Sequence, residues 1–184
     1  MTSSHPHLKM NNISLIGMAG CGKSTLGNAI SEKYNLSFVD TDKLIEAGWQ
    51  MTLEEIKRTH GYETLRKYEE DVILNLDKST KVISTGGSAV YSAKSMKYLK
   101  SFSKIIYINT PLETILERID KGQERGLAVP ENLSIEEVYS ERKPLYEQFS
   151  QLSIDGTKSI DELIDIVLNT VSYTHLRAHE TTPH

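Results

Sequence analysis

NISLIGMAGCGKST, residues 12–25, is the stretch that decides the fold. Its first part is short, apolar and β-prone and ends at Gly17, which predicts a buried strand over residues 12–16. From Gly17 onward it satisfies the pattern G-x-x-x-x-G-K-[ST], in which a glycine-rich turn joins a strand to a helix. A chance match in a chain of this length is roughly a 1-in-100 event. The stretch therefore predicts a loop whose backbone N–H groups surround a phosphate.

The residue types of this loop suit the binding of a nucleoside triphosphate. Lys23 is expected to reach the β- and γ-phosphates, and the Ser24 hydroxyl is expected to ligate Mg²⁺. A glycine-rich turn without a ligand is the alternative. The residues predicted to hold the nucleotide here are Gly20, Cys21, Gly22, Lys23, Ser24 and Thr25.

Cys21 is the only cysteine of the chain. A single cysteine excludes an internal disulfide framework and a cysteine-rich zinc site, and it favours the cytosol as the compartment. Inside the loop it is either a small residue that is tolerated there or a thiol activated by the helix N-terminus and Lys23. Under the second hypothesis, bound ATP protects the chain from a thiol reagent.

Strands and helices alternate along the rest of the chain. Further strands are predicted over residues 37–39, 81–84, 104–109 and 152–154, and helices over 23–34, 42–46, 53–59, 62–76, 92–101, 111–119, 134–149 and 159–171. Thr52 is expected to cap the helix after it, and Ser134 to form a capping box with Glu137. The alternation predicts an α/β fold, a three-layer α/β/α sandwich around a five-stranded parallel sheet.

The composition describes one globular domain. The 184 residues are 38% hydrophobic and 25% charged, with a formal net charge of −4. Because a uniformly basic surface is missing, the composition argues against a protein that coats nucleic acid or an anionic membrane. No apolar run approaches the ~20 residues of a membrane-spanning helix.

The predicted domain covers residues 12–171. Residues 1–11 are polar and irregular, and we expect a disordered lead-in. Residues 172–184, SYTHLRAHETTPH, resemble a translated sequencing-adapter tail, with an ordinary disordered tail as the alternative. These two ends hold five of the six histidines, so histidine-based metal or nucleophile chemistry is not indicated. Residues 121–133, which are rich in glycine and proline, are predicted to form a mobile loop, the lid of the domain.

Two carboxylates follow the second predicted strand, in the stretch FVDTD at residues 38–42. In an extended segment Asp40 and Asp42 would point the same way. Beside a phosphate-binding loop they can divide the work, since one can hold Mg²⁺ through water while the other orients a substrate hydroxyl. A solvated acidic turn is the alternative.

The chain resembles the shikimate kinase family, a small branch of the nucleoside-monophosphate-kinase-like P-loop proteins. The resemblance implies a P-loop NTPase fold of the nucleoside-monophosphate-kinase type. It also implies a monomer that uses ATP and Mg²⁺ to phosphorylate the 3-hydroxyl of shikimate. The matching pieces occur in the family's order across about residues 12–171: GMAGCGKSTLG at 17–27, FVDTDKLIE at 38–46, Gly61 with LRKYE at 65–69, STGGSAV at 84–90 and ERKPLY at 141–146.

The resemblance implies the residues that recognise the acceptor. Asp42 would hydrogen-bond the ring hydroxyls, including the one that is phosphorylated, and is a candidate proton acceptor. Arg66 and Arg142 would pair with the shikimate carboxylate, whose geometry suits the planar guanidinium fork. Gly86 and Gly87 would let the backbone approach the substrate ring.

The resemblance also implies residues on the nucleotide side. Asp40 would lie near Mg²⁺, Arg118 would stack on adenine, and Arg125 would reach the transferring phosphates from the lid.

On the acceptor side, the resemblance implies that Glu69 would lie one helical turn after Arg66 and steady it.

Two positions depart from the family's pattern. Ser88 stands where a third glycine is usual, and Gly126 follows the lid arginine where proline is common. A side chain at position 88 either crowds shikimate or hydrogen-bonds a different acceptor. Two alternatives therefore stay open: a kinase of gluconate or another small hydroxylated metabolite, and a non-catalytic ATP-binding module.

Overall fold

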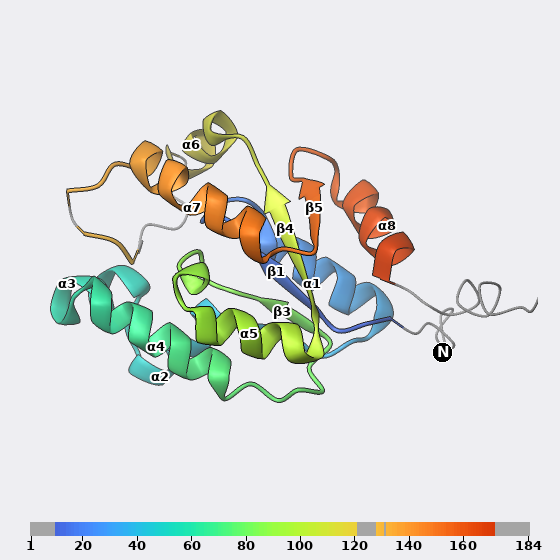
Figure 1. Cartoon of the computed structure of the whole chain (residues 1–184), viewed down its shortest axis with the longest axis horizontal. Coiled ribbons are helices and arrows are strands. Elements are labelled where there is room, and N and C mark those ends of the chain that lie inside the picture. Colours follow the sequence, from blue (N-terminus) through green and yellow to red (C-terminus); the bar gives the residue numbers. More distant parts are fainter. Residues whose placement is uncertain (1–9, 121–127, 131, 172–184) are drawn as a thin grey trace, which may run out of the picture.

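A five-stranded parallel sheet forms the centre of the computed structural model, which describes residues 10–120, 128–130 and 132–171 (Figure 1). The strand order is β2-β3-β1-β4-β5, and each neighbouring pair is parallel. The predicted α/β fold and its five parallel strands are confirmed. The strands are β1 Ile13–Ile16, β2 Phe38–Asp40, β3 Val82–Ser84, β4 Lys104–Asn109 and β5 Leu152–Asp155.

Helices cover both faces of the sheet, as expected for parallel strands joined by crossovers. Most predicted helices lie within one or two residues of their observed bounds. The largest difference is α2, which begins directly after β2 and extends three residues further than predicted. The short 3₁₀ helix η1 was not predicted. The helices are α1 Lys23–Tyr34, α2 Thr41–Trp49, α3 Leu53–His60, α4 Tyr62–Leu74, η1 Ala89–Tyr91, α5 Ala93–Phe102, α6 Leu112–Asp120, α7 Ile135–Phe149 and α8 Ile160–Val171.

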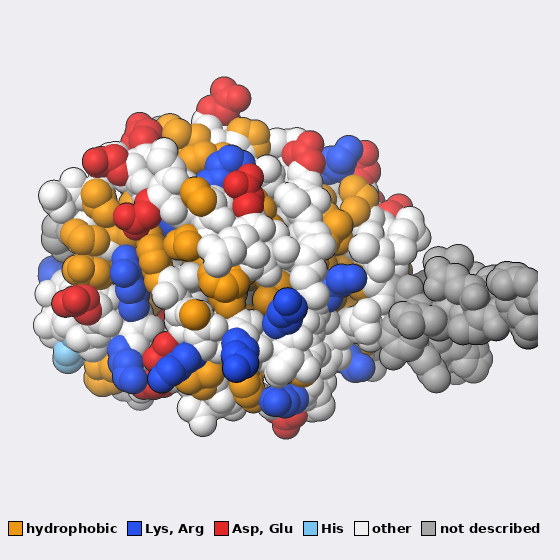
Figure 2. Space-filling model, in the orientation of Figure 1, with side chains coloured by type: hydrophobic (Ala, Val, Ile, Leu, Met, Phe, Trp, Pro, Cys, Tyr) orange, Lys and Arg blue, Asp and Glu red, His pale blue; other side chains and the backbone are white. Residues whose placement is uncertain are grey.

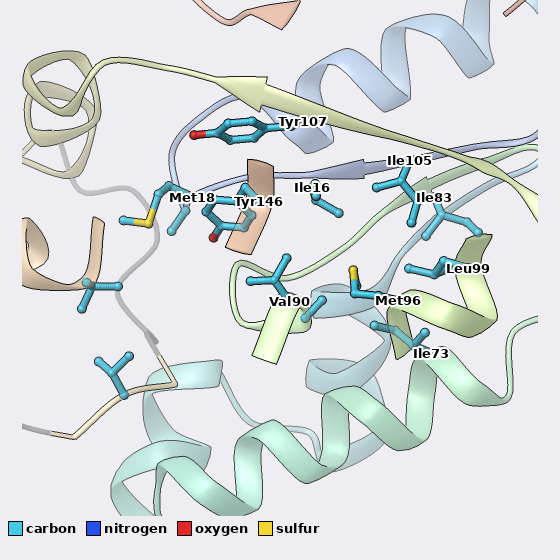
Figure 3. Close-up of a cluster of buried hydrophobic side chains, with 14 of the residues drawn as sticks. Ile16, Met18, Ile73, Ile83, Val90, Met96, Leu99, Ile105, Tyr107 and Tyr146 are labelled. Atoms are coloured by element: carbon cyan, nitrogen blue, oxygen red, sulfur yellow. The ribbon is translucent and has the colours of Figure 1, made fainter. Parts of the chain in front are cut away.

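The sheet separates two hydrophobic clusters, and β4 shows how. Successive side chains of a strand point to opposite faces. Ile105 and Tyr107 accordingly belong to the cluster packed under α4, α5 and α7, part of which Figure 3 shows. Ile106 and Ile108 belong to the other cluster, which packs against α1 and α8. The run KIIYIN is therefore apolar on both faces because both are covered.

A third, smaller cluster lies apart from the sheet, between α2, α3 and α4. Ile45, Leu53, Ile56 and Leu65 are buried there, and Ala128 packs against them from the far end of the predicted lid. The predicted cap of α3 is confirmed, since Thr52 and Glu55 form a capping box. This cluster holds α2, α3 and α4 together beside the carboxyl end of β2.

The folded domain begins earlier than predicted. Met10 is buried in the cluster under α1 and α8, and the Asn11 N–H donates to the Val171 carbonyl. These two residues therefore belong to the domain and not to the lead-in. Residues 1–9, 172–184 and most of the predicted lid lie outside the described residues.

The described surface carries cations in spite of the net negative charge. Lys94, Lys97 and Lys100 of α5 are exposed. Figure 2 shows Lys and Arg side chains on the face that it draws, interspersed with acidic and hydrophobic ones. Among the helices that the structure describes, none is long and apolar enough to cross a membrane.

Candidate active site

The loop between β1 and α1, residues 17–25, is the phosphate loop of the structure. Gly22 caps α1 with a φ of 105°, a left-handed conformation that favours glycine, and no side chain caps this helix. Lys23 is buried, and its Nζ donates to the carbonyls of Gly17 at 2.7 Å and Met18 at 3.0 Å. The loop thus combines an ammonium group with an uncapped helix N-terminus, and both attract anions.

Cys21 is buried in the phosphate loop with an exposed fraction of 2%. Its Sγ lies 3.8 Å from Lys23 Nζ, and its carbonyl accepts a hydrogen bond from Thr110. Burial restricts the access of a thiol reagent, so the predicted protection by ATP requires a conformation in which the thiol is more exposed than here.

Ser24 and Asp40 meet at the carboxyl end of the sheet. The Ser24 hydroxyl donates to Asp40 Oδ2 at 2.5 Å and lies 3.3 Å from the Ser84 hydroxyl. A cavity of about 200 Å³ opens beside them, and Lys23 and Asp42 also line it. The atoms that could ligate a metal ion here are the side-chain oxygens of Ser24 and Asp40. They leave room in the cavity for water and phosphate oxygens as further ligands. That set fits Mg²⁺, which keeps several waters and takes one or two carboxylates.

Asp40 and Asp42 share this cavity, although the predicted reason is wrong. They do not lie in one extended segment, because Asp40 ends β2 and its side chain accepts from the Lys43 N–H as the N-cap of α2. The helix therefore starts at Thr41, and Asp42 lies in its first turn. The strand-to-helix junction places both carboxylates on the cavity wall.

A buried carboxylate lies deeper in the cleft. Glu69 on α4 is 3% exposed and accepts a short hydrogen bond from the Ser88 hydroxyl. Burial raises the pKa of Glu69, and the Ser88 bond and the nearby Arg142 charge partly oppose that shift. The hydroxyl of Ser88, the residue that departs from the expected glycine, is thus engaged by Glu69, while Ser88 also lines the small cavity beside Glu69.

The two glycines after β3 allow side chains to approach the backbone closely. A Cβ at Gly87 would lie 2.6 Å from Arg142 Nη1, and one at Gly86 would collide with the carboxylates of Glu69 and Asp42. The Gly86 N–H donates to Thr41 Oγ1 at 3.1 Å. Any larger residue at either position would displace the charged groups of the cleft.

Arg142 on α7 is the most deeply buried cation of this cluster, with 1% exposure. Its Nε donates to the Tyr91 hydroxyl at 3.4 Å, and its Nη2 has no hydrogen-bond partner among the described residues. Tyr146, one turn further along α7, donates to the Gly87 carbonyl at 2.7 Å and stacks on Tyr107, as Figure 3 shows. An unpartnered buried guanidinium nitrogen is costly unless an anion completes it.

Arg66 lies beside this cluster, on α4. Its Nε donates to the Ala128 carbonyl at 2.8 Å, and its guanidinium carbon lies 3.8 Å from the centre of the Tyr91 ring. Among the described residues no ion pair joins Arg66 to Glu69, so the contact expected to steady Arg66 is not observed. Arg66 lies in a groove of about 260 Å³. This groove adjoins a smaller cavity, the acceptor cavity, because Glu69 and Ser88 line both.

The acceptor cavity itself is small, about 20 Å³. That volume is close to the space that one water molecule needs. Asp42, Glu69, Gly87, Ser88 and Arg142 line it, together with apolar residues of the third cluster. The structure therefore brings together most of the residues predicted to touch the acceptor, in a closed arrangement.

Arg118 lies on the opposite side of the phosphate loop. Its Nη1 donates to the Gly20 carbonyl at 2.7 Å. With Gly22, Thr25, Gly156 and Lys158 it lines a groove of about 330 Å³ between α1, α6 and the β5–α8 connection. The groove adjoins the phosphate loop, as a nucleotide requires. Arg125, predicted to reach the phosphates, lies outside the described residues.

Sequence reasoning missed the aromatic residues that contact the arginines. Tyr91 touches both Arg66 and Arg142, and Tyr146 ties the helix of Arg142 to Gly87. Tyr146 belongs to the quoted stretch ERKPLY, which was a usable signal. Tyr91 follows STGGSAV directly, but nothing in its neighbourhood indicated a contact with residues 25 and 51 positions away.

Comparisons with known proteins agree with this geometry. The family model described as shikimate kinase matches residues 19–172. The chain belongs to the shikimate kinase family. It is 34% identical to the shikimate kinase of Persephonella marina over 164 residues, which cover 88% of this chain and 99% of the relative. Membership makes the chain an ATP-dependent kinase.

Solved structures of the family share the fold. A shikimate kinase from Acinetobacter baumannii, solved in complex with shikimate, superimposes with a TM-score of 0.77 at 28% identity, covering 95% of this chain and 97% of that one. The shikimate kinase of Aquifex aeolicus gives 0.73 at 28% identity, covering 86% and 95%. The P-loop fold of the nucleoside-monophosphate-kinase type is thereby confirmed.

Proposed function

We propose that the chain transfers the γ-phosphoryl group of ATP to the 3-hydroxyl of shikimate. The observation that carries the proposal is the buried Arg142, whose Nη2 lacks a partner among the described residues and which lines a cavity with Asp42. A carboxylate with several hydroxyls matches that pairing of a guanidinium with a carboxylate acceptor. The cavity adjoins the phosphate loop, because Ala19 and Asp42 line both this cavity and the one beside Lys23.

ATP binds with its phosphates on the phosphate loop. The N–H groups at the start of α1 point to the phosphates, and Lys23 leaves the carbonyls of Gly17 and Met18 to reach the β- and γ-phosphates. The base lies in the groove beside Arg118. Ser24 and Asp40 hold Mg²⁺, which when bound neutralises phosphate charge.

Shikimate binds on the other side of the phosphate loop. Arg142, with Arg66 beside it, pairs with the carboxylate of the substrate and so fixes the orientation of the ring. Gly86 and Gly87 let Asp42 and Arg142 lie against the backbone beside the ring, because a Cβ at either position would displace these charged groups. Asp42 accepts hydrogen bonds from the ring hydroxyls.

The chemistry needs little more than this positioning. Phosphoryl transfer depends mainly on alignment and on charge stabilisation. Asp42 lines both the acceptor cavity and the phosphate cavity, so the hydroxyl that it orients faces the γ-phosphorus in line. Asp42 accepts the proton of that hydroxyl as its oxygen bonds to the γ-phosphorus and the bond from that phosphorus to the bridging oxygen breaks, which releases ADP. Lys23 stabilises the charge on the transferring group.

A coupled assay for ADP release over a panel of hydroxy acids tests the proposal. We expect ATP turnover that depends on shikimate, and no comparable turnover with gluconate. Lys23→Ala supplies the inactive control. Turnover with gluconate but not shikimate would move the chain to another metabolite kinase, and no turnover with any acceptor would favour an ATP-binding module.

We further propose that the enzyme works as a monomer in the cytosol. The single cysteine is in keeping with a reducing compartment. Light scattering of the full chain should give the monomer mass across the working concentrations. A dimer mass would overturn this part alone and leave the phosphotransfer proposal intact.

A further inference from the structure

We infer that Tyr91 is a positioning residue, one that holds Arg66 and Arg142 so that both guanidinium groups can meet a single carboxylate. The inference deepens the proposed function and rests on it. Both arginines contact the same ring: their guanidinium carbons lie 3.8 Å and 5.4 Å from its centre. They come from α4 and α7, which are distant in the sequence.

Arg66 contacts the face of the Tyr91 ring. At 3.8 Å its guanidinium carbon is in stacking contact, and a second ring, that of Tyr62, lies 5.0 Å away. The electron-rich face of an aromatic ring attracts a cation and favours a parallel guanidinium. Its Nε bond to the Ala128 carbonyl fixes one edge of the group. The Tyr91 ring and the Ala128 carbonyl therefore set the direction of the Arg66 guanidinium, and no carboxylate of the described residues forms an ion pair with it.

Arg142 contacts the hydroxyl end of the same residue. Its Nε donates to the Tyr91 oxygen at 3.4 Å, while the Tyr91 O–H donates to Glu141. A phenol has one proton to donate, so donation to Glu141 leaves its lone pairs free for Arg142. The Glu141 contact thereby sets the direction of the Tyr91 hydroxyl. Because Arg142 uses its Nε for this hydroxyl, its Nη2 is the nitrogen that remains for a ligand.

Placing two guanidinium groups near each other costs electrostatic repulsion. Tyr91 offsets that cost because its ring face and its oxygen are both negative. The ring is half-buried on η1, where the Tyr91 N–H donates to the Ser88 carbonyl at 3.0 Å and Ser92 begins α5 as its cap. Burial and the Glu141 contact raise the pKa of Tyr91, which keeps the phenol protonated at neutral pH.

Tyr91→Ala and Tyr91→Phe test the inference by steady-state kinetics. We expect the alanine variant to raise KM for shikimate by about tenfold and the phenylalanine variant by about threefold, since the latter keeps the ring face. The KM for ATP should stay unchanged in both. Because a loss of folding would also reduce activity, melting of each variant is recorded alongside.

The matched controls are Tyr98→Ala and Tyr98→Phe. Tyr98 is also half-buried and also donates its hydroxyl to the protein, at 2.6 Å to the Leu76 carbonyl, but it packs against Phe102 away from the arginines. Its variants should lower stability without raising KM for shikimate. If Tyr98→Ala raises that KM as much as Tyr91→Ala does, the effect is structural and the inference fails.

A double-mutant cycle with Arg66 gives the sharper readout. If Tyr91 acts through the arginines, Tyr91→Ala should raise KM for shikimate by a smaller factor once Arg66→Ala is present, because only the contact with Arg142 then remains to be lost. Full additivity would overturn the inference. Wild-type enzyme without shikimate-dependent turnover would instead overturn the proposed function, so the two failures are distinguishable.

Discussion

The two sides of the cleft are built in different ways. On the nucleotide side, a continuous segment of nine residues, 17–25, offers backbone N–H groups and one lysine, and α1 begins at Lys23, after Gly22, with no side-chain cap. On the acceptor side, α3 and α7 begin with complete capping boxes, the charged groups come from α2, α4 and α7, and η1 adds the Tyr91 side chain. The uncapped helix leaves its N–H groups to a ligand, whereas the capped helices use theirs for stability.

The difference explains which ligand each side can choose. A backbone loop accepts any polyphosphate of suitable length, because every residue has the same N–H group. Side chains from four elements specify one arrangement of carboxylate and hydroxyls. Substitutions on the nucleotide side should therefore affect catalysis, and those on the acceptor side should affect substrate choice.

Lys23→Ala should give the largest effect. Removing the ammonium group from the phosphate loop should lower kcat on the order of 10²–10³-fold, because the transferring group loses its main protein charge. Shikimate binding, measured by calorimetry without ATP, should stay near the wild-type value. A large loss of shikimate affinity in this variant would break the division between the two sides.

Arg142→Ala should act in the opposite sense. We expect KM for shikimate to rise by about 10²-fold and KM for ATP to change little, since removing one partner of a buried charge pair costs about 2–5 kcal/mol. Arg142→Lys keeps the charge next to Glu69 and so guards against misfolding, but it loses the guanidinium fork. Equal effects on both KM values would contradict the assigned role.

Ser88→Gly restores the family's glycine and should have a smaller, pH-dependent effect. The Ser88 bond lowers the pKa of Glu69, so its removal should raise that pKa further. The ionised carboxylate is the form that the nearby Arg142 charge stabilises, and it is lost as pH falls through the pKa. The acidic limb of kcat/KM for shikimate should therefore move to higher pH.

Ser88→Ala is the matched variant for this test. It removes the hydroxyl and keeps the Cβ, so the same movement of the acidic limb is expected. A shift seen only with glycine would assign the effect to the Cβ and would contradict the hydrogen bond as its cause.

The capping boxes should give the smallest effects. Ser134→Ala and Thr52→Ala should each lower the free energy of unfolding by about 1 kcal/mol, measured by urea titration. Both caps stabilise helices of the acceptor side and touch no ligand, so kcat should be unchanged. A change in kcat with Ser134→Ala would show that the start of α7 is coupled to Arg142, two turns away.

The features that could be predicted from the sequence are those that residues close together in the chain determine. The phosphate loop, the strand over residues 104–109, the Thr52 cap and the Ser134 capping box follow from local periodicity and spacing, and the structure has them. The start of α2 at Thr41 was predicted one residue late because Asp40 serves both as the last strand residue and as a helix cap. A period-2 pattern cannot show where such a junction changes direction.

The contacts that the sequence did not predict join distant segments. Ser88 with Glu69, Tyr91 with two arginines, and Arg66 with the Ala128 carbonyl depend on how α4, η1 and α7 pack. Residue types alone indicated charged groups in these places. Their pairing follows from tertiary packing, which no local pattern encodes.

The closed acceptor cavity has a thermodynamic consequence. A site of about 20 Å³ admits shikimate only after the surrounding side chains or helices move apart. The observed dissociation constant is then the intrinsic one divided by the fraction of molecules that are open. Each tenfold decrease in the fraction of open molecules weakens the observed binding free energy by about 1.4 kcal/mol, even though every contact in the bound state is unchanged. The apolar residues of the third hydrophobic cluster, which line this cavity, thereby gain control over the affinity for shikimate by holding the closed arrangement.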